Sequence, residues 1–131
     1  MLFRSDIGPV ISKRQQGVVE NYLALARDSG LRVAAQGSIP ADVPAGGHYV
    51  RPTLFDEVPA DHALAQQEIF GPVQVLIAFD GEAEALRIAN GTPFGLVAGV
   101  WTRDGGRQMR DRKSTRLNSS HLRLSRMPSA A

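Results

Sequence analysis

The chain has 131 residues, 43% of them apolar, a formal net charge of +2 and no cysteine. That length and apolar content are ordinary for one globular domain with a buried core, which argues against wholesale disorder. The missing cysteines exclude disulfides, thiolate metal sites and a cysteine nucleophile. Because no apolar run approaches the length of a membrane span, and the N-terminus lacks the apolar core of a signal peptide, we expect a cytoplasmic protein.

The first predicted element is a helix within residues 11–30. Ser12 and Gln15 have the spacing of a capping box, in which each side chain satisfies a free backbone N–H of the first turn. Apolar residues recur behind them at helical spacing, and Gly30 suits the helix end. Residues 31–37, "LRVAAQG", then predict a short strand.

Three further elements are predicted before residue 80. Residues 48–58, "HYVRPTLFDEV", are expected to be extended, with Pro52 at an edge or an irregular point. Residues 60–68 predict a short helical turn. Residues 73–79, "VQVLIAF", are almost all apolar, which is typical of a strand covered on both faces in a parallel sheet.

A second helix is predicted over residues 80–91, with Asp80 as its N-cap. Residues 95–102, "GLVAGVWT", predict another buried strand, and Trp101 at its end is expected in the core. A strand, a helix and a strand at this spacing form a crossover unit, which implies a parallel sheet. Residues 103–110 then predict the beginning of one more helix.

The last segment differs from the rest in charge. Up to Arg110 the acidic residues slightly outnumber the basic ones, whereas residues 111–131 hold five basic residues and one acidic residue. Such a tail could neutralise phosphates of nucleic acid or of an anionic membrane. A disordered, solvated tail without a function is the plainer interpretation, since the segment has no apolar face.

Both ends can be encoded by one DNA element in opposite orientations. The codons CTC TTC CGA TCT encode residues 2–5. The reverse complement of that DNA, translated from its second base, encodes residues 111–113. The string "DRKSTRLNSSH" also resembles a translated sequencing-library adapter. We therefore expect residues 1–5 and 111–131 to be adapter-derived, which leaves residues 6–110 as the protein proper.

Four stretches of the chain resemble the aldehyde dehydrogenases, in that family's order. They are "GPVISKRQ" (8–15), "YVRPTLFDEV" (49–58), "QEIFGPV" (67–73) and "IANGTPFGLVAGVWTRD" (88–104). The resemblance implies an α/β fold, namely part of a three-layer αβα catalytic domain with a mainly parallel sheet. It also implies a parent enzyme, a homo-oligomer, that oxidises an aldehyde to a carboxylic acid with NAD or NADP.

The resemblance also implies what this chain lacks. The family's nucleophile is a cysteine thiolate and its general base a glutamate, and both lie upstream of the matching segment, as does the glycine-bearing cofactor turn. We therefore expect no catalytic residue in this chain, no activity of the chain alone, and no tight cofactor binding. No metal, nucleic acid or membrane is expected as a partner.

Two cofactor-binding residues follow from the resemblance. Glu68 matches the carboxylate that accepts hydrogen bonds from the hydroxyls of the nicotinamide-side ribose, and Phe70 matches the ring that packs beside that ribose. A charged acceptor suits two hydroxyl donors because its hydrogen bonds are short and strong. Without the resemblance, Glu68 would be a solvent-facing cap and Phe70 a core side chain. Gln67 is expected to be an exposed neighbour.

Two other classes of function stay open at this point. One is a small free-standing module that binds a nucleotide or a protein through an exposed sheet edge. The other is a basic nucleic-acid-binding protein, which would interleave aromatic residues with its basic ones, and the tail has none. His48, His62 and His121 share no metal-ligand spacing and are expected at the surface.

Overall fold

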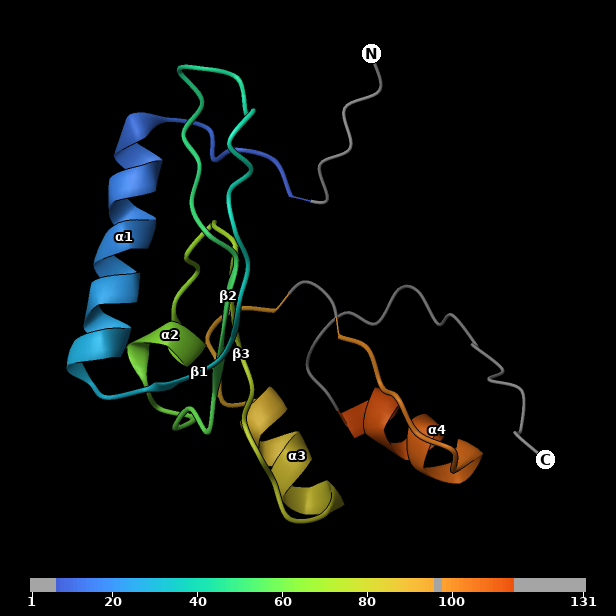
Figure 1. Cartoon of the computed structure of the whole chain (residues 1–131). Coiled ribbons are helices and arrows are strands. Elements are labelled where there is room, and N and C mark those ends of the chain that lie inside the picture. The colour runs from blue at the N-terminus through green and yellow to red at the C-terminus, as the bar shows by residue number, and fades with distance from the viewer. Residues whose placement is uncertain (1–6, 96–97, 115–131) are drawn as a thin grey trace. The chain divides into compact units, whose positions relative to one another are not determined.

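The computed structural model describes residues 7–95 and 98–114. They divide into two compact units, one ending at Ala78 and one beginning at Phe79. The first unit holds α1 (Lys13–Asp28), β1 (Arg32–Gln36), β2 (Thr53–Asp56), α2 (Ala63–Gln66) and β3 (Val73–Val75), and the second holds α3 (Glu82–Ala89) and α4 (Gly105–Ser114) (Figure 1). Within the described residues, no helix is both long enough and apolar enough to span a membrane.

Local signals set both ends of α1. Ser12 is its N-cap, and the Ser12 hydroxyl accepts a hydrogen bond from the backbone N–H of Gln15 at 3.1 Å. At the other end Gly30 has φ +70°, and the next residue, Leu31, donates its N–H back to the carbonyl of Ala26 at 3.0 Å. This left-handed glycine ending satisfies carbonyls of the last turn. The predicted helix and its glycine stop are confirmed.

The first unit is built on a mixed three-stranded sheet in the order β1-β2-β3. β1 pairs antiparallel with β2, and a register shift between Val33 and Ala35 interrupts the pairing. β2 pairs parallel with β3, and α2 lies in the crossover between them. The α/β character is therefore confirmed. The parallel crossover, however, comes earlier in the chain than the expected one between residues 73–79 and 95–102.

The two long apolar runs form less strand than predicted. β3 stops at Val75 and its partner β2 ends at Asp56, where Glu57 has φ +55°, and one further hydrogen bond joins the N–H of Val58 to the carbonyl of Leu76 at 3.1 Å. In the run 95–102, residues 96 and 97 lie outside the described residues, and the others form no strand. Trp101 is 83% exposed, so its prediction as a core residue is wrong. An apolar run becomes a strand only where a neighbouring edge offers hydrogen-bond partners.

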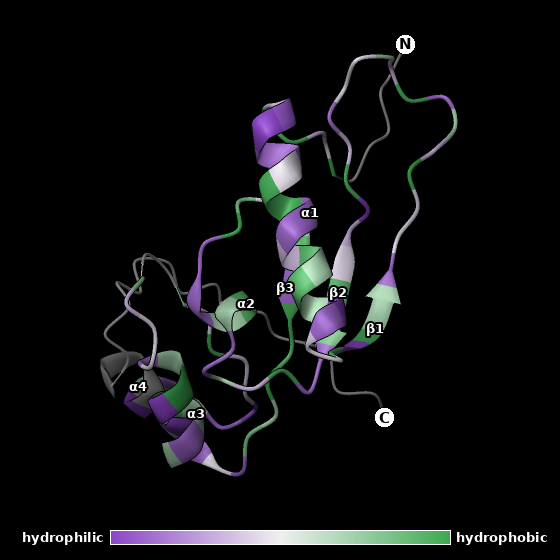
Figure 2. Ribbon diagram, turned by 90° about the vertical axis from the view of Figure 1, so that its left-hand side faces the viewer, coloured by the Kyte–Doolittle hydropathy of each residue, from purple (hydrophilic) through white to green (hydrophobic). Residues whose placement is uncertain are grey.

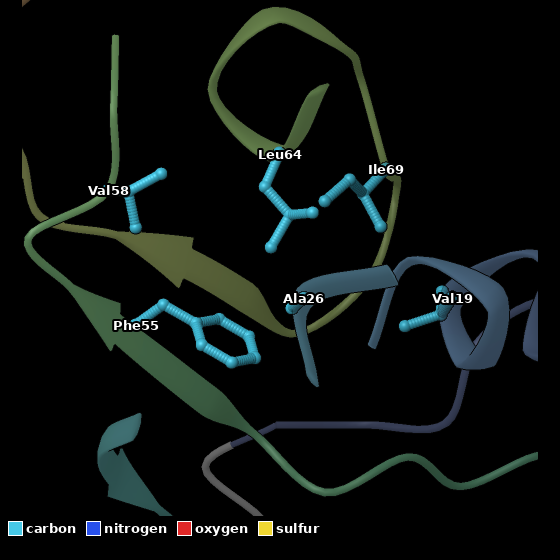
Figure 3. Close-up of a cluster of buried hydrophobic side chains, with 6 residues drawn as sticks. All are labelled: Val19, Ala26, Phe55, Val58, Leu64 and Ile69. Carbon is cyan, nitrogen blue, oxygen red and sulfur yellow. The ribbon is translucent and has the colours of Figure 1, made fainter. Parts of the chain in front are cut away.

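One apolar cluster holds α1, α2 and the sheet together. It consists of Val19, Ala26, Phe55, Val58, Leu64 and Ile69, all at most 7% exposed, and Figure 3 shows their side chains. Figure 2 shows α1 with hydrophilic and hydrophobic stretches alternating along it, as expected for a helix with one buried face. The core thus fixes α1 against the central strand and against the segment that leads into β3.

The second unit contains two helices, α3 and α4. The N-cap of α3 is Gly81 with φ +84°, so the prediction of Asp80 at that position is wrong by one residue. The backbone N–H of Asp80 instead donates to the Glu84 carboxylate at 2.8 Å. α4 confirms the predicted last helix and continues over residues 111–114, while residues 115–131 of the predicted disordered tail lie outside the described residues.

Candidate functional site

Glu68 and Phe70 lie on the turn between α2 and β3, residues 67–72, which we call the site turn. One buried side chain lies among exposed ones: Gln67 and Glu68 are exposed, Ile69 is 7% exposed in the core, and Phe70 is 75% exposed. The interpretation of Phe70 as a core side chain is therefore wrong, because Ile69 fills that place. The exposed position predicted for Gln67 is confirmed.

Phe70 has an unusual backbone conformation. Its φ is +51°, in the left-handed region that side chains other than glycine's rarely adopt. Holding a phenylalanine there costs about 1–2 kcal/mol. Such strain persists only where surrounding contacts impose it, and it is common where a side chain has to be presented to a ligand. Here the strained residue presents a large apolar ring to solvent.

α1 contributes a hydrogen-bond donor to the backbone around Phe70. The side-chain amide of Gln15 donates to the carbonyl of Ile69 at 2.7 Å and lies 3.3 Å from the carbonyl of Phe70. Only half of the predicted capping box is therefore confirmed: Ser12 caps the helix, but the Gln15 amide group reaches 54 residues ahead in the chain instead. Sequence reasoning missed this role, because the spacing of Gln15 from Ser12 has a local explanation.

Gly71, the next residue of the site turn, lies in close contact with α1. A Cβ on Gly71 would lie 2.4 Å from Cγ2 and 3.0 Å from Cγ1 of Val19, which is fully buried. The first of these distances is one that real Cβ atoms do not reach. A residue without a Cβ is thus required at position 71, because the site turn comes close to α1 there. The point of contact on α1 is Val19, one helical turn after Gln15.

A shallow apolar groove of about 590 Å³ lies beside Phe70. Residues 7–11 line one part of it, Gln15 lies in its wall, and residues 70–72 line the other part. Ile11 is 93% exposed, so the groove is open to solvent and its apolar surface is uncovered.

The exposed side chains of the site turn and the residue content of the chain define which chemical groups are present. The carboxylate of Glu68 has no partner among the described residues, so its oxygens are available to hydroxyl donors, while Phe70 and the groove offer an apolar surface. No cysteine exists in the chain to act as a thiolate nucleophile.

No cluster of three metal-ligating side chains occurs in the part of the chain that the structure describes. His62 instead begins α2: its Nδ1 accepts the backbone N–H of Leu64 at 3.1 Å, and its Nε2 lies 3.1 Å from the hydroxyl of Ser29. His48 forms an isolated bridge with Val10, and His121 lies outside the described residues. The His62 ring therefore has a structural role, whereas His48 contributes its backbone.

Two carboxyl groups of the second unit have shifted pKa values. The N–H of Asp80 and the Arg87 guanidinium hold the pKa of Glu84 below its ordinary value. The backbone N–H groups of Arg107 and Gly106 lower the pKa of Asp104, which caps α4. Both shifts arise from nearby hydrogen-bond donors and mark no reactive group.

Comparisons with known proteins agree on one family. A sequence model described as "Aldehyde dehydrogenase family" matches residues 3–122. The chain is 42% identical to the betaine aldehyde dehydrogenase of Agrobacterium fabrum over 108 residues, which are 82% of this chain and 22% of that protein. It is 45% identical to an aldehyde dehydrogenase of Monascus ruber, over 81% of this chain and 21% of that protein.

A solved structure extends the likeness to the fold. The aldehyde dehydrogenase of Mycobacterium tuberculosis, crystallised with NAD+, superposes with a TM-score of 0.79 at 36% identity. The match covers 86% of this chain and 23% of that one. The chain thus spans about a fifth of the length of the curated relatives it matches and has the α/β fold of the corresponding segment.

Proposed function

Because the chain belongs to the aldehyde dehydrogenase family, we propose that it is a segment of an enzyme that oxidises an aldehyde to a carboxylic acid with NAD or NADP. Within that enzyme its part is to hold the cofactor. This role is supported by the conformation of the site turn. The turn exposes Glu68, and it holds a strained, 75% exposed Phe70 at the rim of an apolar groove.

Each of the two side chains has a distinct task in this proposal. The carboxylate of Glu68, which has no partner in the described part of the chain, accepts hydrogen bonds from the two hydroxyls of the nicotinamide-side ribose, and an ionised acceptor strengthens both. The ring of Phe70 packs beside the sugar and limits the positions open to the nicotinamide. The bound cofactor supplies the hydride acceptor, and the reaction rate depends on how well that acceptor is aligned.

The chemical step needs groups that this chain does not contain. A cysteine thiolate has to come from another part of the full-length enzyme, because the chain has no cysteine. The isolated chain is therefore inactive in this proposal, and it binds the cofactor weakly. The aldehyde substrate and the homo-oligomeric state of the parent enzyme belong to the proposal as well.

The test uses a full-length enzyme in which the matching segment of the M. tuberculosis aldehyde dehydrogenase is replaced by residues 7–110 of this chain. We call it the carrier enzyme. Replacing Glu68 by Gln removes the charge but keeps the shape, and it should weaken NAD+ binding or slow hydride transfer about ten- to hundredfold, since hydrogen bonds to charged groups contribute about 1.5–3 kcal/mol. A deuterated aldehyde should then show a larger isotope effect.

Glu57→Gln is the matched control. Glu57 is also an exposed glutamate of the first unit, with φ +55°, but it forms an ion pair with Arg32. Its replacement should leave the NAD+ dissociation constant and the isotope effect unchanged. If Glu68→Gln and Phe70→Leu also leave both quantities unchanged, the two residues do not hold the cofactor. A folded carrier enzyme that makes no NADH would count against the proposed function.

The domain boundaries and the cytoplasmic location remain predictions. For residues 1–5 and 111–131, sequencing the source DNA across both ends is the direct measurement. A reading frame that continues as family sequence in place of these segments would support their origin in an adapter. A natural frame that encodes them as they stand would contradict it.

A further inference from the structure

The amide group of Gln15 contacts the backbone on both sides of Phe70. The carbonyl of Ile69, at 2.7 Å, belongs to the peptide unit before the Cα of Phe70, and the carbonyl of Phe70, at 3.3 Å, belongs to the unit after it. The first unit sets φ of Phe70 and the second sets ψ. One side-chain amide therefore restrains both backbone angles of the strained residue.

These two contacts are part of a larger clamp from the same face of α1. Gln15 and Val19 are one helical turn apart and thus lie one above the other. Gln15 holds the two carbonyls, and Val19 lies directly beneath Gly71. With Ile69 buried in the core, the backbone is fixed before and after Phe70, and the ring has only the outward direction open.

We infer that Gln15 is a positioning residue for the cofactor: it holds Phe70 in its left-handed conformation and so sets the direction of the ring and of the neighbouring Glu68. This inference rests on the proposed function. Gln15 needs no contact with the reacting atoms for this role, because it acts through the backbone of the site turn. Its loss should change cofactor binding more than it changes stability.

The neighbouring residue provides a matched control. Gln16 also uses its side-chain amide on a distant backbone carbonyl, that of Tyr49 at 3.2 Å, and it is also partly buried. Gln15→Leu and Gln16→Leu therefore remove the same chemical group from the same helix. Only the first removes contacts with the site turn.

In the carrier enzyme, Gln15→Leu should raise the NAD+ dissociation constant about tenfold, as expected when hydrogen bonds of ordinary strength are lost. Gln16→Leu should leave it within about twofold of the unmodified carrier enzyme, at a similar loss of melting temperature. The KM for the aldehyde should stay unchanged in both variants. Carbonyl ¹³C resonances of Ile69 and Phe70 should shift in Gln15→Leu only.

Gln15→Glu gives a second, reversible test if the leucine variant does not fold. At neutral pH its carboxylate faces the two carbonyls without a proton to donate, so NAD+ binding should be weak. Acidification protonates the carboxyl group, restores one donor, and should strengthen NAD+ binding relative to the unmodified enzyme at the same pH.

The inference is overturned if Gln15→Leu, or Gln15→Glu at neutral pH, binds NAD+ as the unmodified carrier enzyme does while Glu68→Gln binds it weakly. It is also overturned if Gln15→Leu and Gln16→Leu weaken binding equally, since that would indicate a general loss of structure. If Glu68→Gln and Phe70→Leu have no effect, the proposed function fails instead.

Discussion

Replacing Gly71 by alanine should destabilise the first unit through one identifiable clash. The new Cβ would lie 2.4 Å from Cγ2 of Val19 and 3.0 Å from Cγ1, whereas carbon atoms pack best at about 3.5–4.0 Å. Val19 cannot move away, because a valine in a helix has one strongly preferred rotamer and this one is fully buried. Overpacking of this kind costs about 1–3 kcal/mol.

A double-mutant cycle isolates the clash. Val19→Ala alone removes two buried methyl groups and should cost about 2 kcal/mol, from roughly 0.8 kcal/mol for each group and a small cavity. In the double variant the methyl group introduced at position 71 enters the vacated space. The combined loss should therefore be about 1–2 kcal/mol smaller than the sum of the two single losses.

Hydrogen exchange in the carrier enzyme, read by mass spectrometry on peptides that cover residues 15–26 and 67–75, measures these free energies locally. Gly17→Ala is the control, because Gly17 lies inside α1 and a Cβ added there would have nothing within 4 Å. That change should stabilise the helix by about 0.5–1 kcal/mol. Unchanged exchange in Gly71→Ala, or strictly additive losses in the cycle, would refute the packing argument.

Three further outcomes are expected of the 131-residue chain itself. Because Ile11, Phe70 and Trp101 are at least 75% exposed, purified chain should self-associate or unfold in urea without cooperativity, and a sharp transition from a monomer would contradict this. With NAD+ and an aldehyde it should produce no NADH, measured by absorbance, since it lacks the thiolate; steady production would disprove that. Because donors lower the pKa of folded Glu84, its contribution to α3 should be complete above the ordinary value of 4.5 and lost as pH falls below it. Helical ¹³Cα shifts of α3 that stay equal at about pH 7 and about pH 3 would show this contribution to be absent.

Local elements were predictable because their causes lie within a few residues. Ser12 caps α1 through an N–H three residues away, and Gly30 ends it in the left-handed conformation that glycine adopts freely. The short helical turn at α2 and the strand at β1 follow from equally local patterns. The apolar runs were predicted less well, since a strand also requires a paired edge, and β2 offers β3 only three register partners.

The candidate site shows the same division. The motif in residues 67–73 identifies Glu68 and Phe70 as a pair by resemblance, but spacing alone cannot distinguish an exposed ring from a core residue. The structure decides this, because Ile69 occupies the core and leaves Phe70 outside. It also reveals the role of Gln15, whose capping spacing suggested a purely local partner.

The sequence by itself thus determined the family, the α/β character, the helix ends and the absence of a thiolate nucleophile, all of which depend on residue types and short spacings. Only the tertiary structure decided how the site turn is held: by an amide that reaches across 54 residues and by a glycine pressed against Val19. The physical reason is that a hydrogen bond or a van der Waals contact depends on distance in space, and distance along the chain does not reveal it.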